Sequence, residues 1–174
     1  MIDERPDERT YEALRATIRS RGTARVALFV AGISVWAVLS FALVAAAAFP
    51  LATLFPLVLI AATFEAVFSL HVGVERVGRY LQVFHEDRWE AAAMAFGPPL
   101  AGTGSDPLFT TLFGAAILCN FIPVMLAGPV AAEVVILGAL HAAMLLRVFF
   151  ARRAATHQRA ADLARFEQIR QGQT

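Results

Sequence analysis

Hydrophobic residues in this chain fall into four long blocks separated by charged segments. Each block holds about 20 residues or more, the length at which an α-helix crosses the hydrocarbon core of a bilayer. Strands are not expected, because membrane β-barrels use many short segments of alternating polarity, whereas these blocks are continuous. The pattern predicts an all-α integral membrane protein with four spans, at about residues 24–49, 51–72, 108–127 and 130–150.

Two of the connections between spans are very short. Pro50 and Pro56 surround the first reversal, and Gly128-Pro129 forms the second. Helices that are joined by short turns pack as antiparallel neighbours. We therefore expect a four-helix bundle made of two helical hairpins, both of which turn on the same side of the membrane.

The composition supports this class of protein. Of the 174 residues, 58% are hydrophobic and 17% charged, against about 45 to 50% and about 25% in soluble domains. The first block has small residues at its end, as a signal peptide does, but it is much longer than the apolar region of one. We interpret it as a retained span.

The positions of arginine predict the orientation. Arginines occur before the first block, between the second and third, and after the fourth, whereas the two turns carry none. Basic loops stay on the cytoplasmic side, so both termini and the segment 73–107 are expected in the cytoplasm. The basic residues include no lysine, which is typical of GC-rich bacterial genomes. The expected location is therefore a bacterial inner membrane.

Three polar segments are expected to form amphipathic cytoplasmic helices. Residues 1–23 have apolar side chains at helical spacing and a stop at Gly22. Residues 74–95 are predicted to form an interfacial helix that bends away from the second span at Gly73. Residues 151–174 are predicted to form a helical tail, which either continues the fourth span or docks on the other cytoplasmic parts.

The predicted interfacial helix has two different faces. Helical periodicity separates an apolar stripe, expected to be buried against lipid or the bundle, from a charged side that faces the cytoplasm. We expect the charged side to meet a protein partner. The apolar stripe consists of Val74, Val77, Leu81 and Phe84, and the cytoplasmic interaction face consists of Glu75, Arg76, Arg79, Gln82 and Glu86.

Arginines at the exit of the fourth span are expected to contact lipid. Arg147, Arg152 and Arg153 lie where anionic headgroups begin, and each basic residue near such a surface contributes about 1 kcal/mol. They serve either as simple anchors or as a specific site for a lipid or a partner.

Ionisable residues inside the spans are the most specific candidates for function. Glu65 and His141 stand at similar depths, roughly 10 and 13 Å from the cytoplasmic ends of their spans by helical rise, and are placed to pair across the bundle. Ser34 and Asn120 are expected to complete an intramembrane polar layer. Such residues hold helices together, contact a partner subunit, form a proton or ion pathway, or bind a metal or haem.

Motifs for catalysis are missing from the sequence. It contains no zinc-ligand spacing, nucleotide-binding glycine motif or nucleophile elbow, so we expect neither an enzyme nor a bound cofactor. His71 and His141 are the weak candidates for haem or metal ligands. The net charge of +1 and the single cysteine, Cys119, indicate neither nucleic-acid binding nor an intrachain disulfide.

The function expected from these observations is that of an accessory or assembly subunit in a larger membrane complex. Its partners would be membrane lipids together with another protein or a second copy of the chain. Two alternatives remain open at this point. One is a proton-coupled transporter or channel organised on Glu65 and His141, and the other is a membrane redox protein that binds haem or a metal.

Overall fold

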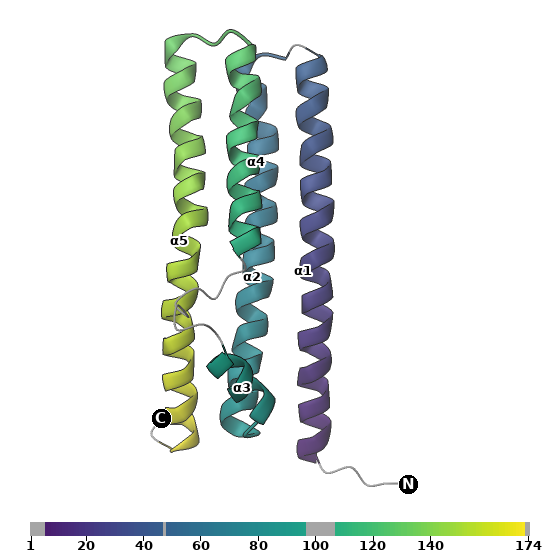
Figure 1. Cartoon of the computed structure of the whole chain (residues 1–174), viewed down its shortest axis with the longest axis vertical. Coiled ribbons are helices and arrows are strands. Elements are labelled where there is room, and N and C mark those ends of the chain that lie inside the picture. Colours follow the sequence, from purple (N-terminus) through teal and green to yellow (C-terminus); the bar gives the residue numbers. More distant parts are fainter. Residues whose placement is uncertain (1–5, 47, 97–106, 173–174) are drawn as a thin grey trace.

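The computed structural model describes residues 6–46, 48–96 and 107–172. Within these ranges it is helical apart from short turns, and it contains no strand. The all-α prediction is therefore confirmed. The elements are α1 (Pro6–Ala45), the 3-10 helix η1 (Pro50–Thr53), α2 (Leu54–Phe84), α3 (Arg88–Phe96), α4 (Pro107–Leu126) and α5 (Ala131–Arg170) (Figure 1).

Four helices, α1, α2, α4 and α5, are long and apolar enough to cross a membrane. They run side by side, with α1 and α5 flanking α2 and α4 (Figure 1). α1 packs mainly against α2, while α5 packs against both α2 and α4. The two described ends of the chain lie at the lower end of the bundle, on either side of α3 (Figure 1).

The packed interior is apolar and joins three of the long helices. Ile60 and Phe64 of α2 meet Phe113 and Ile117 of α4 and Val148 of α5, all of them buried. The bundle therefore divides into two parts. We refer to residues 24–45, 50–72, 109–126 and 131–150 as the apolar half, and to residues 6–23, 73–96 and 151–172 as the polar half.

The long helices continue from the apolar half into the polar half without a break. α1 passes through Gly22 and α2 passes through Gly73, so the stop and the hinge expected at these glycines are wrong. A glycine inside a helix costs about 1 kcal/mol, and packing against neighbouring helices outweighs it. A Cβ at Gly73 would lie 2.7 Å from Arg21 Nη1, so this glycine leaves room for the arginine on α1.

The prediction that residues 74–95 form one interfacial helix is also wrong. α2 ends at Phe84, and Glu86 adopts a positive φ of 48° in the turn that follows. Asp87 then caps α3, because its Oδ1 accepts hydrogen bonds from the backbone N–H groups of Trp89 (2.9 Å) and Glu90 (3.3 Å). Asp87 and Glu90 have the spacing of a capping box, a sequence signal for the start of a new helix.

The C-terminal tail is a direct continuation of α5. The helix begins at Ala131 and ends only at Arg170, so of the two possibilities for residues 151–174 the structure takes the continuous helix. This extension also packs against the polar half of α2, where Phe166 meets Tyr80 and Phe84 edge to face.

Candidate functional site

A network of charges joins α2 to α5 in the polar half. The guanidinium of Arg79 is almost completely buried, with 1% of its side chain exposed, and its Nη2 donates to Asp162 Oδ2 at 2.9 Å. Arg76 Nε donates to the same oxygen at 3.1 Å. One carboxylate of α5 therefore holds two arginines of α2.

Glu75 is the second anionic centre of this network. It accepts a hydrogen bond from Arg159 of α5 and lies 3.5 Å from both Arg79 Nη1 and His71 Nε2. His71, Glu75 and Arg79 of α2 thus form a chain of contacts that is linked to Arg159 and Asp162 of α5.

These contacts correct the predicted cytoplasmic interaction face. Glu75, Arg79 and Gln82 are covered to different degrees, whereas Arg76 and Glu86 remain exposed. The face points toward α5 because Asp162 and Arg159 supply charges that complement it. Since these partners lie more than 80 residues away in the chain, the local periodicity of α2 carries no sign of them.

The first turns of α1 are held to α3 by a second group of polar contacts. Tyr11 Oη donates to Asp87 Oδ2 at 2.9 Å, and Arg15 Nη2 lies 2.5 Å from the same oxygen. Arg15 Nη1 also donates to Glu90 Oε1 at 2.8 Å. A Cβ at Gly78 would lie 2.8 Å from Glu90 Oε2, so Gly78 of α2 lets α3 approach closely.

Asp87 is the centre of this second group. Burial would raise the pKa of its carboxyl, but the hydrogen bonds from Tyr11 and from the backbone N–H of Glu90, together with the charge of Arg15, hold that pKa below its ordinary value. The carboxylate is thus stabilised in its charged form, in which it caps α3 and binds α1 at once. Tyr11, Arg15 and Asp162 were not expected at any site, and Asp87 had a signal only in its capping-box spacing.

Asn120 is the centre of a buried polar cluster in the apolar half. Trp36 Nε1 donates to Asn120 Oδ1 at 3.1 Å, which leaves the amide nitrogen to face the carbonyl oxygen of Thr53 (3.1 Å) and His141 Nε2 (3.0 Å). Because an amide nitrogen only donates, His141 Nε2 accepts. The ring proton then lies on Nδ1, which donates to the Leu137 carbonyl at 2.7 Å.

This cluster differs from the predicted polar layer. Asn120 and His141 do meet, but Ser34 is exposed and Trp36, two residues further along α1, takes its place. Glu65 instead faces Arg147, with Glu65 Oε1 2.8 Å from Arg147 Nε. The expected pair of Glu65 and His141 is therefore wrong, because similar depth in the bundle does not fix which helix face a side chain occupies.

The arginines at the end of the fourth span are placed differently from one another. The Arg147 guanidinium lies over the rings of Phe64 and Phe68 in addition to binding Glu65. Arg153 is exposed and lies over Phe149 and Phe150. The side chain of Arg152 falls outside the described part of the structure.

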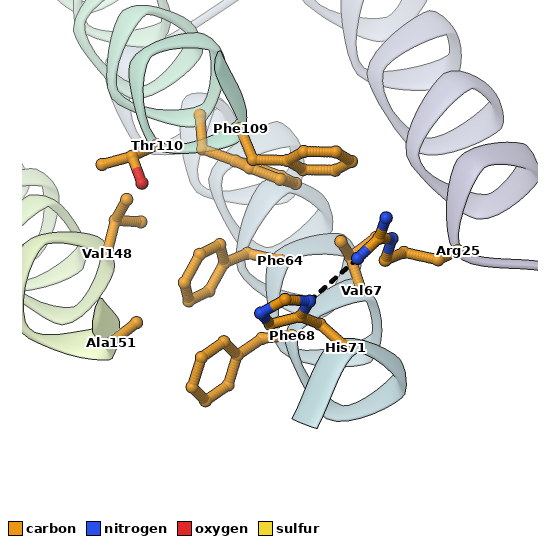
Figure 2. A pocket seen from close by; sticks show the side chains of 10 residues that line it. Arg25, Phe64, Val67, Phe68, His71, Phe109, Thr110, Val148 and Ala151 are labelled. Carbon is orange, nitrogen blue, oxygen red and sulfur yellow. Dashed lines mark hydrogen bonds between the residues drawn. The ribbon is translucent and has the colours of Figure 1, made fainter. Parts of the chain in front are cut away.

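A cavity of about 40 Å³ lies between the four long helices near the boundary of the two halves (Figure 2). Most of its lining is apolar and aromatic, and its polar groups are Arg25, His71 and Thr110. Arg25 Nη1 and His71 Nδ1 are 2.8 Å apart. A cationic side chain thus borders an apolar cavity here.

The two candidate metal-ligand histidines take separate partners. His71 contacts Arg25 and His141 contacts Asn120. Among the described residues, no group of three or more His, Cys, Asp or Glu side chains is arranged to hold a metal ion. Nothing in the described arrangement joins the two rings into a haem or metal site.

Neither the models of protein families, nor the curated proteins, nor the solved structures include a match to this chain.

Proposed function

We propose that this protein is a small multi-pass subunit of a bacterial inner membrane, built from two helical hairpins with both termini in the cytoplasm. Its role in this proposal is that of an accessory or assembly subunit in a larger membrane complex. The arginine distribution supports the orientation, since all the arginines of the chain belong to the polar segments or to the lower ends of the spans.

The observation that carries the proposal is the uncovered surface of α1. None of the residues in its most apolar 18-residue window is buried, compared with 44% of the corresponding window in α2. α1 lies at the edge of the bundle (Figure 1) and presents Val30, Val38 and Phe41 outward. A partner helix has free access to this surface along its whole length.

α1 is also held firmly in place by the rest of the chain. Gly32 allows it to approach Thr63 of α2, since a Cβ there would lie 2.3 Å from Thr63 Cγ2. Tyr11 and Arg15 fix its beginning to α3. A helix that is held at its beginning and again at Gly32, and is bare along one side, is suited to dock a partner helix.

The polar side chains favour a structural role over transport. Glu65 and His141 take different partners, so the transporter hypothesis loses the pair on which it was organised. The charges of the polar half are used between helices of the same chain. They support the proposal that this half is a rigid extension for assembly.

Crosslinking from α1 tests the proposal. In a chain whose single cysteine is removed by Cys119→Ser, one new cysteine is placed by Val38→Cys on α1, and the matched control is Val58→Cys on α2. Both valines are well exposed, at 70% and 65%. A thiol-reactive photocrosslinker is attached in native membranes, and the products are separated and identified by mass spectrometry.

We expect the cysteine at position 38 to give one discrete, saturable product with another membrane protein, and the cysteine at position 58 to give lipid adducts. Equal labelling patterns at the two positions would contradict the proposal. A product that contains only a second copy of the chain would also overturn it in favour of a homo-oligomer.

A further inference from the structure

The cavity in Figure 2 combines an apolar wall with a cationic end. Phe64 and Phe68 of α2, Phe109 and Phe113 of α4, and Val148 of α5 form the wall. Arg25 approaches from α1 and lies over the ring of Phe109, with its guanidinium carbon 5.7 Å from the ring centroid. A charge and a hydrocarbon surface therefore face the same small volume.

Arg25 has no carboxylate partner among the described residues. It contacts the ring of His71 and the ring of Phe109. Its Nε atom is buried and donates no hydrogen bond. Arginine stays protonated in proteins and presents five N–H donors, so this guanidinium has both a charge and donor capacity that the neighbouring chain does not satisfy.

His71 does not supply the missing negative charge. Because the guanidinium only donates, His71 Nδ1 is the acceptor in the 2.8 Å contact. The ring proton then lies on Nε2, which faces Glu75 Oε1 at 3.5 Å. His71 is thus a neutral ring between Arg25 and the charge network of the polar half, and it fixes the position of the guanidinium.

The location narrows the chemistry of a ligand. Arg25 is at the start of the apolar part of α1, and His71 is near the end of the apolar part of α2, so the cavity lies at the depth where the phosphate or carboxylate of a lipid meets its acyl chain. A water molecule needs about 10 to 15 Å³ of such volume, so the 40 Å³ of this cavity admits a group of about three heavy atoms.

We propose that this cavity binds the head of an anionic amphiphile, with carboxylate or phosphate oxygens against Arg25 and the acyl chain leaving the cavity along the phenylalanine rings. Fatty acids and anionic phospholipids share this chemistry. A charge-assisted hydrogen bond from a desolvated guanidinium gives the head its affinity, and the aromatic wall favours a head that carries a hydrocarbon chain over a free inorganic anion.

The test uses the full-length chain, delipidated in an uncharged detergent, with native mass spectrometry to count bound molecules. The probes are oleate, phosphatidylglycerol, phosphatidylcholine and inorganic phosphate. Oleate distinguishes a fatty acid from a phospholipid as the source of the anionic head. Phosphatidylcholine has acyl chains but no net negative charge, so it tests the need for the charge. Inorganic phosphate is an anion without an acyl chain, so it tests the need for the chain.

We expect one molecule of oleate or of phosphatidylglycerol to bind, and Arg25→Gln to weaken that binding by about tenfold or more. Arg165→Gln is the matched control, because Arg165 is an exposed arginine of the polar half and does not line the cavity. Its affinity should stay within about twofold of the unchanged chain.

Arg25→Lys keeps the charge and is expected to retain part of the binding, which preserves the test if the glutamine variant does not fold. Equal affinity of the Arg25→Gln and Arg165→Gln variants would overturn the proposal. It would also be overturned if phosphatidylcholine or inorganic phosphate bound as tightly as the anionic lipids. Because no partner protein is present in this assay, its outcome is independent of the proposed assembly role.

Discussion

In the apolar half of the bundle the helices meet through hydrocarbon surfaces, one buried amide and the exposed ion pair of Glu65 and Arg147, whereas in the polar half they meet through buried charges. In the apolar half, Ile60, Phe113 and Ile117 are almost completely buried. In the polar half, Arg79 is equally buried, but it is a charged residue paired with Asp162. Three helices thus change their mode of contact along their own length.

In the proposed membrane topology, lipid surrounds the apolar half and water surrounds the polar half. Lipid tails are as apolar as leucine, so helices gain little from hiding apolar surface in a membrane and associate through close packing and hydrogen bonds. Gly32 against Thr63 and Asn120 against His141 are contacts of these two kinds. Charged side chains are stable in water, so burying them between the helices of the polar half requires partners of opposite charge.

The largest expected effect comes from removing the partner of the most deeply buried charge. Asp162→Ala leaves Arg79 with only the more distant carboxylate of Glu75, and loss of one member of a buried pair costs about 3 to 5 kcal/mol. Amide hydrogen exchange should show faster opening of residues 151–170, with little change in the apolar half.

Glu167→Ala is the matched control for that prediction, because Glu167 is an exposed acidic residue of the same helix and such changes stay within about 0.5 kcal/mol. Similar amide exchange rates in the Asp162→Ala and Glu167→Ala variants would show that Asp162 does not hold α5 against α2. The double variant Arg79→Met with Asp162→Leu should regain much of the stability.

A smaller effect is expected from a methyl group in the apolar half. In the Gly32→Ala variant the new Cβ would lie 2.9 Å from Thr63 Cβ and closer still to the rest of that side chain, so α1 must move away from α2. Overpacking of this kind costs about 1 to 3 kcal/mol. Thermal unfolding in detergent measures the loss.

Gly114→Ala controls for helix propensity, because a Cβ at that position meets nothing within 4 Å. That variant should be neutral or more stable, by up to about 1 kcal/mol. A loss of stability that is equal for the two alanines would contradict the view that close approach at Gly32 holds α1 in the apolar half.

The smallest effect is expected from acid, and only in the polar half. Because the folded-state pKa of Asp87 is lowered from 3.8, its contribution is fully present above that value and is lost as the pH falls through the lower folded pKa. Limited proteolysis between α2 and α3 should therefore increase below about pH 4.

Asp87→Asn is the matched control for the acid effect, since an amide keeps an oxygen that caps α3 but removes the charge that Arg15 binds. This variant should be cleaved faster at neutral pH and should lose most of the change on acidification. An unaltered acid response would assign the effect to another carboxylate.

The course of the chain could be predicted in the apolar half because the relevant signal is local. Pro50, Gly128 and the lengths of the apolar blocks give the four long helices and their turns, since each hydrophobic block must satisfy its own backbone hydrogen bonds as a helix. The helix boundaries in the polar half were harder to predict. A glycine such as Gly22 or Gly73 looks the same in the sequence whether it bends a helix or leaves room for a side chain of a neighbouring helix.

The candidate site was predictable only in part for the same reason. Asn120 and His141 were expected together and do meet, whereas Glu65 meets Arg147 and Ser34 is exposed. Depth along a span follows from counting residues. The direction in which a side chain points across the bundle depends on the rotation of each helix, which is set by packing with its neighbours.

The sequence by itself determined that this chain is all-α, where its four membrane-length helices lie, and that its charges gather in the polar half. Only the tertiary structure decided which charges meet. Asp162 reaches Arg79 and Asp87 reaches Arg15 across more than 70 residues of sequence, and the cavity beside Arg25 draws its wall from several helices. Periodicity reports the face of one helix, while pairing depends on how the helices are rotated and staggered against one another.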